Sequence, residues 1–235
     1  MRGLKTDDDR RPAERAEPLL AVLYNQGSAL GHAVRASIRR TRPRLRPDRS
    51  PRNCSPLPID IVMEKYVALI VFGGLPGTGK TTLARLLAED LGALYLRIDT
   101  IEQALRNSQA LPAPIHDAGY RAAYSIAAEN LRLGRTVIAD SVNPLQVTRD
   151  AWRATADHSD AKVFEVEVMC SDTAEHRRRV ETRLSDIPGL SMPTWQEICL
   201  REYQLWDRTR IVVDTANTPI DTSLRALRAA LLITN

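Results

Sequence analysis

From residue 63 onward, the hydrophobic positions alternate between strand-like runs and helix-like spacing. Residues 67–73 form a continuous apolar and β-branched run, as expected for a central strand buried on both faces. Leucines then recur at helical spacing through residue 91. Further strands are predicted at 94–98, 136–139, 162–169 and 211–213, and further helices at 117–133, 147–158 and 224–232. This alternation predicts a five-stranded parallel sheet wrapped by helices, which is a three-layer α/β domain.

Two later helices have recognisable start signals. Asp172 is followed three residues later by Glu175, and Thr194 is followed in the same way by Glu197. This is the spacing of a capping box, in which two side chains satisfy free amide groups at a helix start. We therefore expect a small helical lid over about residues 172–200, after the fourth strand.

The positive charge of the chain is concentrated in its first quarter. Residues 1–62 hold 13 basic and 7 acidic residues, whereas residues 63–235 hold 20 and 22. An Arg/Pro/Ser run at 37–52 contains too few apolar residues to offset the entropy of ordering. We expect residues 1–62 to be a disordered extension and residues 63–235 to be the folded domain. A second interpretation, in which Met63 is the natural start, stays open.

Apolar run lengths and cysteine spacing exclude several classes of protein. The longest apolar runs, at 67–72 and 229–233, are far shorter than the roughly 20 residues that span a bilayer, so a transmembrane protein is excluded. Cys54, Cys170 and Cys199 form no CxxC pair and have no metal-ligand spacing with the four histidines. This pattern disfavours a disulfide scaffold or zinc module and favours a cytoplasmic location.

A phosphate-binding motif lies between the first strand and the first helix. Residues 74–81 read GLPGTGKT, a full match to GxxxxGK[ST]. In such a P-loop, backbone amides face the phosphates, the lysine reaches the β- and γ-phosphates, and the hydroxyl of Thr81 binds Mg²⁺. The predicted nucleotide-binding residues are Gly74, Pro76, Gly77, Thr78, Gly79, Lys80, Thr81 and Thr82. The sequence therefore predicts binding of a nucleoside triphosphate with Mg²⁺.

Asp140 closes the third predicted strand beside this loop, where a carboxylate can hold Mg²⁺ through water. An alternative is that it only turns the chain. The next residue is Ser141, not the glutamate that activates water in motor ATPases, which disfavours hydrolysis as the main activity. The chain contains no guanine-reading NKxD motif, which disfavours a GTPase.

Asp99 follows the second predicted strand. Because the carboxyl ends of parallel strands face the ligand crevice, Asp99 should face the γ-phosphate and could accept a proton from an attacking hydroxyl. An alternative is that Asp99 caps the next helix in a box with Glu102.

Arg179 and Arg183 are four residues apart, on one expected helix face before a loop at 184–193. Such a pair can close over the phosphates, although a solvated basic face is the alternative.

The segments GLPGTGKTTLARLLA, LRIDTIEQAL, VIADSVNPLQVTRDAW and HRRRVETR resemble bacterial P-loop kinases related to chloramphenicol phosphotransferase, zeta toxin and the kinase half of polynucleotide kinase. Proteins of this group are often called AAA-family ATPases. The resemblance covers residues 66–232 and implies a P-loop NTPase fold with strand order 2-3-1-4-5. It also implies ATP with Mg²⁺, Lys80 and Asp99 as catalytic residues, and Arg179 and Arg183 as lid arginines.

The resulting functional prediction is an ATP-dependent phosphotransferase that acts on a hydroxyl of a small molecule. A 5′-hydroxyl polynucleotide kinase stays open, although the net charge of residues 63–235 disfavours a nucleic-acid groove. An ATP-binding regulatory module with weak ATPase activity also stays open. The predicted acceptor residues are Arg106, Tyr120, Tyr124, Ser141 and Asn143. For the two tyrosines, half-buried packing is the alternative.

Overall fold

The computed structural model describes residues 67–108 and 114–233. The predicted N-terminal extension, residues 1–62, lies outside this part of the chain. The elements follow in the order β1 (Ala68–Gly73), α3 (Lys80–Leu91), β2 (Leu94–Arg97), α4 (Ile98–Asn107), α5 (Ala118–Arg132), β3 (Val137–Asp140), α6 (Gln146–Asp157), β4 (Lys162–Met169), α7 (Thr173–Thr182), α8 (Trp195–Cys199), β5 (Ile211–Asp214) and α9 (Ile220–Ile233). No helix in the described ranges is long and apolar enough to cross a membrane.

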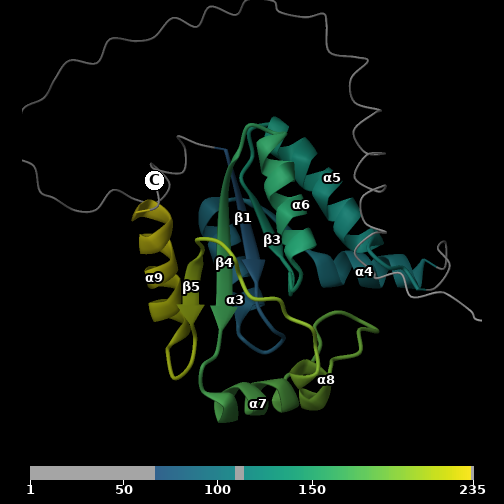
Figure 1. The fold of residues 1–235 in the computed structure, drawn as a ribbon, viewed down its shortest axis with the longest axis vertical. Coiled ribbons are helices and arrows are strands. Elements are labelled where there is room, and N and C mark those ends of the chain that lie inside the picture. Colours follow the sequence, from purple (N-terminus) through teal and green to yellow (C-terminus); the bar gives the residue numbers. More distant parts are fainter. Residues whose placement is uncertain (1–66, 109–113, 234–235) are drawn as a thin grey trace, which may run out of the picture. The chain divides into compact units, whose positions relative to one another are not determined.

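The sheet is five-stranded and parallel, in the order β2-β3-β1-β4-β5 (Figure 1). This confirms the predicted order 2-3-1-4-5. The central strand, β1, is buried along its whole length, as its unbroken apolar sequence requires. Its carboxyl end leads directly into the phosphate-binding loop.

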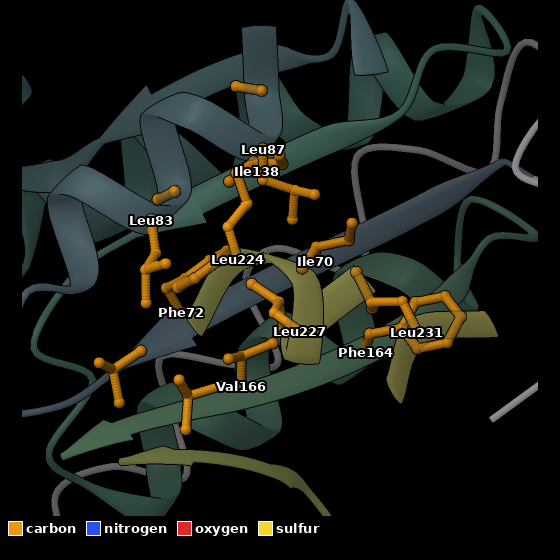
Figure 2. Close-up of a cluster of buried hydrophobic side chains, with 14 of the residues drawn as sticks. Ile70, Phe72, Leu83, Leu87, Ile138, Phe164, Val166, Leu224, Leu227 and Leu231 are labelled. Carbon is orange, nitrogen blue, oxygen red and sulfur yellow. The ribbon is translucent and has the colours of Figure 1, made fainter. Parts of the chain in front are cut away.

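Helices cover both faces of the sheet and give the predicted three layers. On one face, α3 and α9 pack against the sheet, and Leu87 and Leu227 share a buried cluster with Ile70 of β1 (Figure 2). On the other face, α5 and α6 cover β1 and β3, with Ala123 and Trp152 in the core. Each fully buried leucine contributes roughly 1.5–3 kcal/mol relative to an exposed one, so these two layers hold the sheet rigid.

The start signals of the lid helices are confirmed. The Asp172 carboxylate accepts a hydrogen bond from the Glu175 amide at 3.0 Å, at the start of α7. Thr194 and Glu197 form a complete capping box at the start of α8. The two lid helices therefore begin where the sequence indicates.

The proposed cap at Asp99 is wrong. Strand β2 ends at Arg97, and Asp99 already lies in the first turn of α4. The residue at the N-cap position is Arg97, and no side chain caps this helix. Glu102 instead accepts a hydrogen bond from Arg106 at 3.0 Å. Asp99 is therefore free of a capping role.

A buried arginine connects two loops at the carboxyl end of the sheet. Arg149 of α6 is fully buried, and its guanidinium donates to the backbone carbonyls of Asn143 (3.1 Å), Gln204 (2.8 Å) and Leu205 (3.2 Å). The guanidinium carbon lies 4.0 Å from the centre of the Trp206 ring. Within the described ranges, no carboxylate forms an ion pair with it. Backbone dipoles and the aromatic ring compensate its charge.

Replacing this side chain should therefore destabilise the domain. Arg149→Met is expected to lower the free energy of unfolding by about 2–3 kcal/mol, because several buried carbonyls lose their donor. Urea unfolding of the full chain measures the change. Arg132→Met, at an exposed site on α5, is the matched control and should change stability by less than about 0.5 kcal/mol. Equal stability of the two variants would contradict the role given to Arg149.

Candidate functional site

The loop between β1 and α3 depends on the close approach of backbone segments. Gly74 has a φ of 137°, and a Cβ at this position would lie 2.2 Å from the Val168 carbonyl oxygen. Helix α3 then begins after Gly79, which has no side chain to satisfy the first amides of the helix. Those free amides, together with the helix dipole, make this loop suitable for binding phosphate.

The lid helix α7 packs directly on this loop. The His176 ring donates a hydrogen bond from Nε2 to the Pro76 carbonyl at 2.8 Å, and the ring is buried. A Cβ on Gly77 would lie 2.6 Å from Val180, so only glycine allows this approach. His176 was missed from the sequence, where the only signal was its place in the lid segment.

Arg179 supports the loop from its other side. Its guanidinium donates to the hydroxyl of Thr215 at 2.8 Å and to the Glu175 carboxylate at 2.6 Å. The Thr215 hydroxyl in turn lies 2.8 Å from the Thr78 carbonyl of the loop. Arg179 therefore joins α7 to the segment after β5.

Lys80 is buried at the start of α3 among charged groups. Burial lowers the pKa of its ammonium group, and the carboxylates of Asp140 and Asp99 oppose this effect. The side chain is thus held in a place where a phosphate would provide the counter-charge that burial demands.

Asp140, at the end of β3, has one carboxylate oxygen that accepts a hydrogen bond and one that has no hydrogen-bond partner. Its Oδ2 accepts a hydrogen bond from the Tyr95 hydroxyl at 2.7 Å, while its buried Oδ1 has no hydrogen-bond partner. Burial, and then the Asp140 charge, raise the pKa of Tyr95, so the phenol remains a donor. The sequence reasoning missed Tyr95, although the expected adjacency of β2 and β3 was a signal for it.

The residues at this point fit a magnesium ion. A carboxylate oxygen with no partner and the hydroxyl of Thr81 are hard oxygen donors, which Mg²⁺ prefers. No group of three or more His, Cys, Asp or Glu side chains in the described ranges could hold a metal. A bound Mg²⁺ would therefore also need nucleotide oxygens and water, which is usual for this ion.

A cavity of about 530 Å³ opens beside the loop. The end of the P-loop and helix α4 form one side of it, and residues 189–193 of the lid form another. Its lining residues are Pro76, Lys80, Thr81, Arg97, Asp99, Glu102, Gln103, Arg106, Val142, Arg183, Gly189, Leu190, Ser191, Met192, Pro193 and Arg201. Of the predicted catalytic and acceptor residues, Lys80, Asp99, Arg106 and Arg183 are brought together here.

The side chains of the two lid arginines point to different partners. Arg183 is the C-cap of α7, one turn after Arg179, and its amide donates to the Arg179 carbonyl. The Arg179 guanidinium is held by Glu175 and Thr215. Arg183 enters the cavity, whereas Arg179 does not line it. The Nε and Nη2 atoms of Arg183 are buried without hydrogen-bond partners, and burial lowers the pKa of its guanidinium. This side chain is therefore available to an anion.

Four predicted acceptor residues lie outside the cavity lining. Tyr124 packs its ring edge-on against Trp152 at 4.5 Å, and the Tyr120 hydroxyl accepts from the Asn143 amide at 3.2 Å. Ser141 and Asn143 are themselves buried. These side chains belong to the packing between α5, α6 and β3, which was the alternative for the tyrosines.

An ion pair joins the lid loop to the end of β2. Arg97 Nη1 donates to both carboxylate oxygens of Asp186, at 2.7 and 2.9 Å, and Arg85 contacts the same carboxylate. The hydrogen bond from Arg97 is the main cause that lowers the pKa of Asp186 to about 2. Arg97 and Asp186 are 89 residues apart, so no local pattern could have indicated the pair.

Solved structures of similar fold include several kinases. A gluconokinase from Sinorhizobium meliloti is 21% identical, with a TM-score of 0.52 over 72% of this chain and 94% of its own. The APS kinase of Mycobacterium tuberculosis, solved with AMPPNP and APS, is 19% identical, with a TM-score of 0.52 over 72% and 99%. A sugar kinase from Janibacter sp. is 20% identical, with a TM-score of 0.50 over 72% and 95%.

At these identities the likeness shows the P-loop fold alone. A search of curated proteins gave no match. A family model described as an AAA domain matches residues 69–188, slightly more than half of the chain, and the chain therefore belongs to this AAA domain family.

Proposed function

We propose that the protein transfers the γ-phosphate of ATP to a hydroxyl group of a small molecule. The observation that carries this proposal is that a single cavity contains the P-loop lysine Lys80, the carboxylate of Asp99 and the guanidinium of Arg183. Phosphoryl transfer needs this combination of a phosphate cradle, a proton acceptor and a cation near the transferred group.

The nucleotide would be held by the P-loop residues and by Mg²⁺. The amides at the start of α3 and the ammonium of Lys80 bind the phosphates, and Thr82 lies in the same first turn. The Thr81 hydroxyl and Asp140 would hold the ion, with Tyr95 orienting the Asp140 carboxylate. When bound, Mg²⁺ would neutralise part of the charge on the β- and γ-phosphates.

Asp99 is the proposed general base. Its side chain is 40% exposed, and Arg97 Nε lies 3.8 Å from its Oδ2 and orients the carboxylate. The acceptor oxygen forms a bond to the γ-phosphorus while the bond to the β–γ bridging oxygen breaks and ADP leaves. The hydroxyl proton passes to Asp99. Arg183 donates its unpaired N–H groups to the oxygens of the transferring phosphoryl group.

Lid closure favours an alcohol over water as the acceptor. A Cβ on Gly189 would lie 3.2 Å from Gln103 Nε2, so the lid loop sits closely on α4. Asp186 holds this loop to Arg97 at the end of β2. Because the residue after Asp140 is serine, the site also lacks the glutamate that would activate water there.

The finer assignment to kinases related to chloramphenicol phosphotransferase, zeta toxin and polynucleotide kinase rests on the four motif segments given above. We propose the small-molecule acceptor over polynucleotide. We also propose a cytoplasmic location and a catalytic domain over residues 63–235. Radiolabelled ATP, incubated with and without a panel of metabolites and with 5′-hydroxyl oligonucleotides, separates a kinase from a polynucleotide kinase and from an ATP-binding regulator.

Lys80→Ala should abolish transfer without unfolding the protein. We expect the transfer rate to fall at least about 100-fold, because the Lys80 ammonium is the group that contacts the phosphates. We expect the fold to be kept, because the variant removes a charge whose burial is unfavourable. Transfer of label from ATP and thermal unfolding are measured together. Lys162→Ala, at the start of β4 and outside the cavity lining, is the control and should remain active. A folded, fully active Lys80→Ala enzyme would refute the proposed function.

Asp99→Asn should lower kcat by about 10²–10⁴, the usual effect of losing a positioned base. Stability and ATP affinity should change little, because Asp99 caps no helix and its side chain is partly exposed. The measurement is kcat with an identified acceptor. Asp117→Asn, at the exposed start of α5, is the matched control. If Asp99→Asn retained a kcat within about threefold of wild type, Asp99 would not be the base.

The Asp186 ion pair predicts a pH dependence of stability. Its pKa is about 2 in the folded protein, below the ordinary 3.8, so the folded state binds fewer protons between these values. The stabilisation is therefore complete above about pH 4 and is lost as the pH falls toward 2. Asp186→Asn should be less stable than wild type at pH 5, and the difference should shrink at pH 3.

Urea midpoints at the two pH values provide the measurement for Asp186→Asn. Glu181→Gln, which removes an exposed carboxylate from α7, is the control and should keep the wild-type pH dependence. A difference between Asp186→Asn and wild type that stays constant with pH would contradict the role of the ion pair.

A further inference from the structure

The cavity carries more positive than negative charge. Its lining contains five cationic side chains and two carboxylates, namely Lys80, Arg97, Arg106, Arg183 and Arg201 against Asp99 and Glu102. An aqueous cavity with such an excess attracts anions. The phosphates of a bound nucleotide would neutralise part of this positive charge. The remaining cations would be available to a second anion.

Two of the arginines are already paired within the protein. Arg97 is held by both oxygens of Asp186, and Arg106 donates to Glu102 at 3.0 Å. Arg201 forms no ion pair with any carboxylate in the described ranges. The nearby Glu197 carboxylate is engaged by the Thr194 amide and hydroxyl in the capping box. Arg201, which is exposed to solvent, therefore brings to the cavity a guanidinium that forms no ion pair within the described ranges.

The cations that line the cavity do not all serve the nucleotide. Lys80 and Arg183 serve the ATP phosphates in the proposed mechanism. Arg106 donates to Glu102, one turn further along α4 than Asp99. Arg201 lines the same cavity and acts electrostatically on both Glu102 and Arg183, so it lies near each of them. Arg106 and Arg201 have no task in the proposed mechanism.

We propose that the phosphate acceptor is itself an anion, with a phosphate, sulfate or carboxylate group bound by Arg201 and by the N–H groups of Arg106 other than the one donated to Glu102. This inference rests on the proposed function, since it concerns the acceptor of the same reaction. Guanidinium groups present paired N–H donors that match the oxygens of all three anions. The hydroxyl that receives the phosphate then lies at Asp99, and the anionic group anchors the other end of the molecule.

The helix sets the size of such an acceptor. Asp99 and Arg106 are seven residues apart on α4, and Glu102 and Gln103 line the cavity between them. At 1.5 Å per residue, this separation corresponds to roughly 10 Å along the helix between the residue that faces the reacting hydroxyl and the arginine that binds the anion. This span fits a sugar acid, a sugar phosphate or a nucleotide, and it is too long for a two-carbon hydroxy acid.

Binding of a simple anion tests the site without any knowledge of the acceptor. The full chain is saturated with AMPPNP and Mg²⁺, so that the P-loop is filled. Inorganic phosphate, sulfate and acetate are then titrated separately by calorimetry at constant ionic strength. We expect the wild type to bind at least one of them, and the preferred ion identifies the anionic group. Arg201→Gln should weaken that binding about tenfold, because a charge-assisted pair is lost.

Two further variants separate a bound anion from a change in fold. Arg201→Lys keeps the charge and should retain part of the affinity. Arg177→Gln, on the exposed side of α7, is the matched control and should bind like wild type. The inference is overturned if none of the three ions binds, or if Arg201→Gln binds as tightly as wild type.

The transfer reaction provides the second arm. Matched pairs of neutral and anionic hydroxyl compounds are compared, such as sugars against sugar acids and sugar phosphates, and nucleosides against nucleoside monophosphates. We expect the anionic partner to have the higher kcat/KM. Arg201→Gln should raise the KM for the acceptor about tenfold while leaving the KM for ATP unchanged. If the neutral compound of a pair were the better acceptor, the inference of an anionic acceptor would be overturned, and the proposed kinase function would still stand. Absence of transfer to every compound would instead refute the proposed function, and the anion titration would still decide the site.

Discussion

The structure depends on one steric constraint, which is the absence of side chains where the loop after β1 packs against β4 and α7. A Cβ at Gly74 would collide with the Val168 carbonyl, and a Cβ at Gly77 would collide with Val180 of α7. The loop is therefore packed between β4 and the lid helix α7, and glycine is required at each of these two contacts. The burial of β1 on both faces serves this arrangement, because a rigid central strand fixes the place from which the loop leaves the sheet.

The lid and the carboxyl-terminal segment meet through the same loop. His176 of α7 binds the Pro76 carbonyl, and Thr215 after β5 contacts the Thr78 carbonyl. Each contact uses a backbone oxygen of the loop and none of its amides. The supports on the two sides are themselves connected, since Arg179 extends from the lid to Thr215. The loop, the lid helix α7 and the segment after β5 are therefore joined through main-chain oxygens of the loop.

Sequence reasoning succeeded where short-range pattern decides structure. The P-loop match, the alternation of strands and helices, and the helix starts at Asp172 and Thr194 all depend on residues within a few positions of one another. It placed the boundary between β2 and α4 too late and offered a capping role for Asp99, because the strand passes directly into α4 with no glycine or proline to mark the boundary. It also missed the ion pair between Arg97 and Asp186 and the presence of Arg201 in the cavity lining. Those positions follow from how the lid folds back over α4, which local spacing does not encode.

The buried guanidinium of Arg149 has a consequence for how freely its surroundings can vary in evolution. It recognises the segment at residues 204–205 only through carbonyl oxygens, and every amino acid supplies a carbonyl. The Leu205 side chain is 91% exposed although its carbonyl is bound in the interior. Natural variants could therefore exchange this side chain while the path of the chain stays fixed. Insertions or deletions between α8 and β5, which would move those carbonyls, should be far rarer than substitutions.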